Sequence, residues 1–109
     1  MPNRLVLSGQ RAVKSAEDRT LNLYPEGRAR IVREATIAKP YGWIFFYQSN
    51  EFLDNGTAQL AGNAPIIVDR NTLELRVTGT ARPLEEYFAE YEASIPPAAL
   101  QGAPQLLTW

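Results

Sequence analysis

Gly42-Trp43-Ile44-Phe45-Phe46-Tyr47-Gln48 is the stretch of the sequence that decides the fold. Side chains alternate between the two faces of a β-strand, and here both faces are apolar. Such a strand is normally central in its sheet and covered on both sides. We interpret the row of Trp43, Phe45 and Tyr47 as sheet core beneath a helix rather than as a platform that stacks on a ligand, because aromatic side chains dominate core burial. Gly42 should allow a close approach of a neighbouring element, or mark a bulge.

Further strands are predicted on either side of this stretch. Residues 29–38 are rich in Ile, Val and Thr, and Lys39-Pro40 ends that strand because proline cannot donate to a ladder. Residues 66–68 form a short strand, and residues 73–77 alternate between apolar and polar side chains, as a strand with one wet face does. Short turns join these strands, which is typical of an antiparallel sheet.

A helix is predicted over residues 83–95. Pro83 suits the first helical position, and Glu85 and Glu86 suit the first turn, where the helix dipole favours negative charge. One apolar stripe follows at helical spacing: Leu84, Tyr87, Phe88, Tyr91 and Ile95. The chain is therefore expected to be an α+β protein, with an antiparallel sheet of about four strands and this amphipathic helix (about 83–95) packed on one face.

The two ends of the chain are patterned less clearly. Residues 10–19 are good helix formers, residues 20–24 alternate with the period of a strand, and residues 25–27 are typical of a turn. The apolar side chains of Leu106, Leu107 and Trp109 indicate a tail that docks on the domain. We expect a single domain (1–109) with a variable N-terminal element (1–27), a core (28–93) and a C-terminal tail (96–109).

The composition argues against most catalytic chemistry. The chain has no histidine and no cysteine, which removes thiolate catalysis, Ser-His-Asp mechanisms and the usual ligands of transition metals. A carboxylate-pair hydrolase or a carboxylate-only Mg²⁺ site stays formally open, although the sequence shows no cleft or burial-shifted carboxylate. We therefore expect a protein that is not an enzyme, with no metal, no cofactor and no small-molecule ligand.

Charge and hydropathy argue against nucleic acid and membranes as partners. The net charge of -1 gives no field that would gather nucleic acid or anionic lipid. Glu26 and Glu34 interleave with Arg28, Arg30 and Arg33, which argues against a nucleic-acid patch. No apolar stretch approaches the ~20 residues that span a bilayer, and the apolar run near the N-terminus is shorter than a signal peptide requires. These features predict a soluble, cytoplasmic protein.

Three blocks of sequence are more specific than their periodicity. They are residues 41–47 (YGWIFFY), residues 60–69 (LAGNAPIIVD) and residues 79–87 (GTARPLEEY), the last extended by Glu90-Tyr91-Glu92. In this order and spacing they closely resemble the immunity protein 35 domain family, also called YrhB-like. The resemblance covers residues 28–93. One departure stands out, because members usually open with a longer helix rich in Ala and Leu, whereas residues 1–27 are polar and contain Pro25 and Gly27.

The resemblance implies a function and a partner. Members are small bacterial cytoplasmic proteins, many encoded beside a polymorphic toxin, and are thought to protect the producing cell by binding that toxin. The family has no catalytic residues to carry over. An immunity protein is thus expected, with a cognate toxin from the adjacent gene as its partner. Some relatives are linked to chaperone-like behaviour, so a stress protein that binds unfolded clients is the alternative.

Six polar residues are the candidate contacts with that partner. Asn50, Glu51, Asp54 and Asn55 belong to a long, polar segment between compact strands, where binding residues are often found. Glu86 and Glu90 belong to the acidic side of the predicted helix, together with Glu85 and Glu92, and could meet a basic patch on a partner. The competing interpretation of the acidic residues is a solvated helix face that complements the helix dipole.

Overall fold

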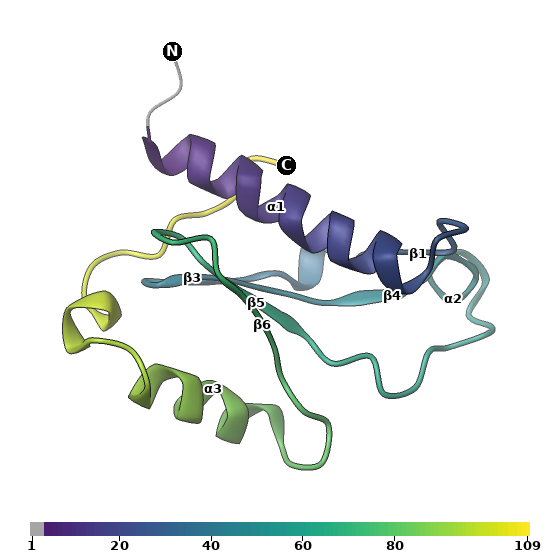
Figure 1. Ribbon diagram of the computed structural model, residues 1–109. Coiled ribbons are helices and arrows are strands. Elements are labelled where there is room, and N and C mark those ends of the chain that lie inside the picture. Colours follow the sequence, from purple (N-terminus) through teal and green to yellow (C-terminus); the bar gives the residue numbers. More distant parts are fainter. Residues whose placement is uncertain (1–3) are drawn as a thin grey trace.

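The computed structural model describes residues 4–109, with side chains from residue 8 onward, and Met1–Asn3 lie outside the described residues. The protein has three layers, with one long helix above the strands and a second helix below them (Figure 1). In chain order the elements are α1 (Arg4–Leu23), β1 (Ala29–Ile31), the 3₁₀ helix η1 (Arg33–Ala35), β2 (Ile37–Lys39), β3 (Gly42–Phe45), β4 (Tyr47–Ser49), α2 (Asn50–Asn55), β5 (Ile66–Asp69), β6 (Leu75–Val77), α3 (Leu84–Ala93) and the 3₁₀ helix η2 (Pro97–Leu100).

The strands form two antiparallel sheets. Four strands pair in the order β2-β3-β5-β6, and β1 pairs separately with β4. The α+β class and the antiparallel sheet are therefore confirmed, and β3 has the central position expected of it, between β2 and β5. The α3 helix covers one face of this sheet, as predicted. It begins at Leu84, so Pro83 caps the helix instead of occupying its first turn.

Two of the predicted strands are broken. Residues 29–38 form β1, η1 and β2 instead of one strand, and residues 42–48 divide between β3 and β4. One local feature causes both breaks. Five residues, 32–36, lie opposite only two residues, 45–46, of the chain segment with which β1 and β2 pair. The surplus residues bulge out as η1, and a bulge bends and twists a ribbon, which separates β1 and β4 from the larger sheet. No proline or glycine marks this point in the sequence.

The aromatic row of the central strand is core, but under a different helix from the one expected. Trp43, Phe45 and Tyr47 are buried against Ala12 and Ala16 of α1, so α1 covers this face and not the helix of residues 83–95. The opposite face of the same strand meets α3. A strand with two apolar faces is thus covered by a helix on each side, as the sequence predicted.

The second core lies between the sheet and α3. Tyr41, Ile44 and Ile67 are buried there, and Phe88 and Tyr91 of α3 pack against them. These α3 residues belong to the apolar stripe predicted for this helix. Burial of one stripe of a helix against a sheet is the usual source of helix stability in a domain.

Helix α1 is longer than the sequence suggested. It runs for 20 residues, so the predicted strand at residues 20–24 is wrong and so is the expected absence of a long opening helix. Its buried stripe includes the small residues Ala12, Ala16 and Thr20, which recur every four positions, and Gly9 is buried as well. The Thr20 hydroxyl donates to the Ala16 carbonyl at 2.9 Å, which satisfies a polar group inside the helix.

Candidate partner-binding surfaces

The polar segment between β4 and β5 begins with the short helix α2, and residues 56–65 follow it as a loop. Ser49 caps the N-terminus of α2, because its Oγ accepts from the Phe52 N–H at 3.0 Å and donates to the Ala58 carbonyl at 2.7 Å. Gly56 ends the helix with a left-handed conformation. The helix extends over Asn50–Asn55. Four of the six candidate residues therefore share one small helix at one end of the molecule (Figure 1).

Two of these four candidates are engaged within the protein. The Asn50 amide donates to the Gly27 carbonyl at 2.8 Å and accepts from Arg30 at 3.0 Å. The Asp54 carboxylate also accepts from Arg30 at 3.0 Å. These contacts fasten α2 to β1, whereas Glu51 and Asn55 are exposed. The Glu51 carboxylate accepts one hydrogen bond, from Thr57 at 3.0 Å.

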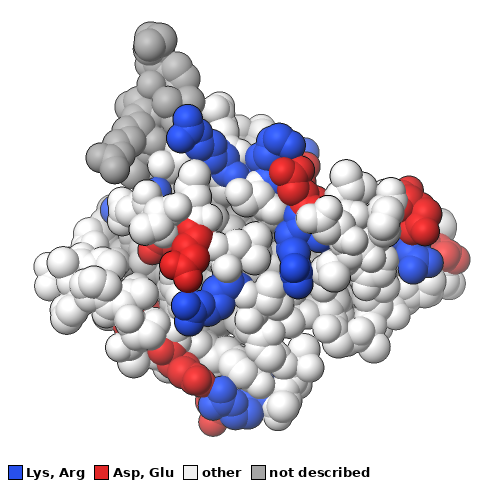
Figure 2. Space-filling view, viewed as in Figure 1, with Lys and Arg blue, Asp and Glu red and all other residues white. Residues whose placement is uncertain are grey.

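The other two candidates lie on α3, on the far side of the sheet from α1 (Figure 1). Glu86 and Glu90 are both exposed. Glu90 pairs with Arg82, whose guanidinium also stacks over the Tyr87 ring at 4.4 Å from its centroid. The structure therefore places the α2 group and the α3 group on separate parts of the surface. Figure 2 shows acidic and basic side chains interspersed over the visible face, so no single sign dominates it.

The third sequence block has a structural explanation. Gly79 lies so close to Tyr87 that an added Cβ would be 2.6 Å from its hydroxyl oxygen. That oxygen accepts from the Ala81 N–H at 3.0 Å, and Arg82 stacks on the same ring. Together these contacts hold the connection from β6 to α3. These residues of the block therefore have a structural role, which is to position α3 relative to β6.

A polar link joins α3 to the sheet beside the second core. The buried Tyr41 hydroxyl donates to Glu92 at 2.9 Å, and Lys39 lies 3.7 Å from the same carboxylate. Burial and this hydrogen bond raise the pKa of Tyr41 above its ordinary value. Glu92, one of the acidic residues expected on a solvated or partner-facing helix side, is therefore directed at the sheet.

This link predicts a loss of stability at high pH. The unfolded chain releases the tyrosine proton near pH 10, whereas the folded chain retains it to higher pH. The contribution of Tyr41 is therefore fully present below about pH 10 and is lost as the pH rises above that value. Tyr41→Phe should cost about 1 kcal/mol at neutral pH and should make the alkaline decline shallower, measured by urea unfolding at a series of pH values. A decline of unchanged slope would contradict the prediction. The free energy of unfolding of the variant should still decline somewhat at alkaline pH, since burial also raises the pKa of Tyr47 and Tyr91.

The C-terminal tail docks beside α1, on the same face of the sheet. The Trp43 indole N–H donates to the Gln105 carbonyl at 2.7 Å, and Leu107 packs on the first core. The Trp109 ring meets Phe45 edge to face, with 6.1 Å between ring centroids. Docking of the tail is therefore as predicted for Leu107 and Trp109. Leu106 is different, because 75% of it is exposed.

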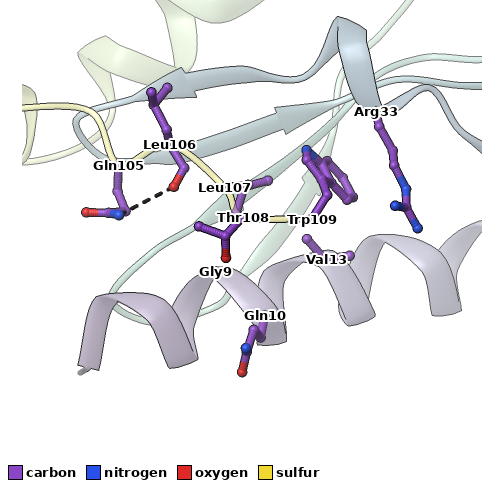
Figure 3. A pocket seen from close by; sticks show the side chains of 9 residues that line it. All are labelled: Gly9, Gln10, Val13, Arg33, Gln105, Leu106, Leu107, Thr108 and Trp109. Atoms are coloured by element: carbon purple, nitrogen blue, oxygen red, sulfur yellow. Dashed lines mark hydrogen bonds between the residues drawn. The ribbon is translucent and has the colours of Figure 1, made fainter. Parts of the chain in front are cut away.

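A cleft of about 230 Å³ opens between this tail and α1, and no motif in the sequence indicates it directly. Figure 3 shows the tail crossing near α1, with the side chains of Val13 and Arg33 next to Trp109. The complete lining is Gly9, Gln10, Val13, Arg33, Gln105, Leu106, Leu107, Thr108 and Trp109. Gly9 was an indirect signal, since a glycine inside a helix usually has a packing reason. An added Cβ there would be 3.0 Å from the Leu107 side chain, so Gly9 makes room for the tail.

Potential metal ligands and membrane-spanning helices were sought among the described residues. Within residues 4–109, no three acidic side chains gather closely enough to hold a metal ion. No helix in that range combines the length and apolar character needed to cross a membrane.

Comparisons with known proteins identify the family. The model of the family described as immunity protein 35 matches residues 10–90, well over half of the chain and including most of α1. Over 53 residues the chain is also 51% identical to an uncharacterized protein, YrhB, of Escherichia coli strain K12. That alignment covers 47% of this chain and 56% of YrhB, so the chain spans about half the length of this curated relative. No solved structure matches the chain. The chain therefore belongs to the immunity protein 35 family.

Proposed function

We propose that this protein binds a cognate bacterial toxin and neutralises it by stoichiometric contact, without chemistry of its own. The observation that carries the proposal is the family match over residues 10–90. The absence of histidine and cysteine supports it, because imidazole general bases and thiolate nucleophiles are missing. The partner would be the product of an adjacent gene, and the two would meet in the cytoplasm of the producing cell.

Neutralisation would work by covering the toxin. An interface of ordinary size buries about 800 Å² on each partner, roughly an eighth of the 6758 Å² that this chain exposes. Coverage of that extent can cap an active site or block the surface that receives a substrate. A few aromatic or arginine residues should dominate the binding energy. Asn50, Glu51, Asp54, Asn55, Glu86 and Glu90 stay predictions of contact, and those on α2 and α3 cannot all be central to one such interface.

The test is a titration of toxin activity. The toxin domain encoded beside this gene is purified, and its activity is measured as this protein is added. We expect complete inhibition at an equimolar ratio and a one-to-one complex by size-exclusion chromatography with light scattering. Inhibition at a small fraction of that ratio would indicate catalysis. If no toxin gene lies nearby, and deletion leaves cells no more sensitive to their siblings, the proposal fails.

A second function has one observation in its favour. Leu106 is 75% exposed and Trp109 is 43% exposed beside the apolar cleft, and exposed apolar surface can bind unfolded chains. A chaperone-like protein would suppress the aggregation of several unrelated clients. Activity in that assay, together with no tight complex with the neighbouring toxin, would favour this second function over immunity.

A further inference from the structure

We propose that the toxin docks on the cleft between α1 and the tail, with an apolar side chain in the cleft and a neighbouring carboxylate on Arg33. This inference rests on the proposed function and specifies the surface that performs it. The surface begins at Leu106 and Trp109, passes Arg33, and continues along a second groove that reaches Leu53 of α2. Arg33 lines both the cleft and this groove, so the two hollows adjoin at its side chain.

The cleft has the size and character of an anchor pocket. An apolar cavity of about 150 Å³ holds a benzene ring, and this cleft measures about 230 Å³. Gly9, Val13, Leu107 and Trp109 give it largely apolar walls, so it can take one aromatic or branched side chain of a partner. Dominant contacts in interfaces cluster in such pockets and are enriched in Trp and Arg, the two residue types found at this rim.

The charge at the rim specifies the partner's chemistry. Four arginines stack on aromatic rings in the described part of the chain: Arg28 on Tyr24, Arg33 on Trp109, Arg76 on Tyr91 and Arg82 on Tyr87. Three of them also pair with a glutamate of this chain. Among residues 8–109, no carboxylate of a side chain lies within salt-bridge distance of the fourth, Arg33. Stacking on Trp109 holds the Arg33 guanidinium in one orientation. Its planar N–H groups can then donate to both oxygens of a carboxylate on the partner.

The location of the tail fits a role in specificity. Residues 105–109 lie outside the family match, which ends at residue 90. A segment beyond the shared scaffold can differ between family members without disturbing β3 or α3. Discrimination between toxins requires such differences in contacts or clashes. By contrast, Glu90 on α3 is already neutralised by Arg82, so the acidic helix face offers a weaker reason for binding.

The experiment measures the affinity for the neighbouring toxin domain, made inactive by mutation, through isothermal titration calorimetry. Arg33→Glu should weaken binding by at least about 30-fold, and Leu106→Asp by at least about tenfold. Two matched controls should stay within about twofold of the unaltered protein: Arg76→Glu, another arginine stacked on an aromatic ring, and Leu21→Asp, another exposed leucine. Arg33→Lys keeps the positive charge but loses the planar guanidinium, so its affinity should lie between those of the unaltered protein and Arg33→Glu.

The outcomes separate this inference from the proposed function. Thermal unfolding of each variant checks that the fold is intact, and since Leu106 is exposed its substitution should leave the melting temperature unchanged. If the unaltered protein binds and both cleft variants bind equally well, the docking site lies elsewhere and the inference fails while immunity stands. If the controls weaken binding as much as the cleft variants do, the inference also fails. If the unaltered protein does not bind the toxin domain at all, both proposals fall together.

Discussion

Replacing Trp43 by alanine should lower the free energy of unfolding by about 3–5 kcal/mol, which is a large part of the stability of a domain of this size. The indole is fully buried between the sheet, α1 and the tail, so its removal leaves a cavity that rigid strands cannot close. The substitution also removes the N–H that holds the Gln105 carbonyl. Urea unfolding followed by circular dichroism and fluorescence would measure the loss.

Trp109→Ala is the matched control for this prediction. The chain has only two tryptophans, so each variant keeps one as its fluorescent reporter. Trp109 is 43% exposed, and its removal should cost about 1 kcal/mol, since less apolar area is lost. If the Trp43→Ala chain does not fold, Trp43→Phe retains most of the apolar volume and tests the hydrogen bond alone, at about 1 kcal/mol. Equal losses for Trp43→Ala and Trp109→Ala would contradict the burial seen here.

The same substitutions connect the core to the proposed docking surface. The tail forms one wall of the cleft, and the Trp43 N–H is one of the contacts that hold it there. Trp43→Phe should therefore loosen the tail while β3 keeps its pairing. The free energy of toxin binding should then change more than the free energy of unfolding does. That result is expected of a residue that lies beneath a binding surface and positions it.

The sequence revealed the parts of the fold whose signals are local. The two apolar faces of residues 42–48 indicated a central strand, the alternation at residues 73–77 indicated β6, and the stripe of large side chains indicated α3. Each of these signals uses bulky apolar residues at a fixed period. Exposing large apolar side chains to water costs free energy, so a regular row of them indicates which face of the element is buried.

Helix α1 was underestimated because its buried stripe consists of small residues. Ala12 and Ala16 pack on the aromatic row and Thr20 is also buried, whereas Leu21 and Leu23, whose spacing resembled that of a strand, are exposed. The four-residue spacing of the small residues was the available signal. The sequence contains no comparable signal for the break between β1 and β2. The break follows from the registers of the β1–β4 and β2–β3 pairs, and a register is a property of strand pairing and not of either sequence alone.

The candidate site was harder to predict than the fold, because three distant segments build the cleft. Residues 9–13, Arg33 and residues 105–109 meet only after α1 and the tail have docked on the same face. Sequence reasoning favoured polar, loop-like and acidic segments instead. The structure shows that two of those charges, Asp54 and Glu90, are already paired with arginines of the chain, which reduces what they can offer a partner.

Gly42→Ala should destabilise the protein by about 3 kcal/mol, although it adds only one methyl group. A Cβ at this position would lie 2.0 Å from the Val68 carbonyl oxygen and 3.1 Å from the Arg70 backbone nitrogen. Both neighbours are backbone atoms of the adjacent chain, so no side chain can rotate away. The two central strands would have to separate, breaking hydrogen bonds at the middle of the sheet. This is the close approach that the sequence predicted for this glycine.

Gly62→Ala separates this steric effect from the general effect of replacing glycine. Gly62 has a φ of +73° and nothing within 4 Å of an added Cβ, so its substitution should cost only the strain of a left-handed backbone, about 1 kcal/mol. Native-state hydrogen exchange adds a local readout. Amides of β3 and β5 should lose protection in Gly42→Ala, whereas those of Gly62→Ala should change little. If Gly42→Ala is too unstable to study alone, trimethylamine N-oxide restores folding and permits the comparison. Equal costs at the two glycines would mean that β3 and β5 are not packed as closely as the geometry requires.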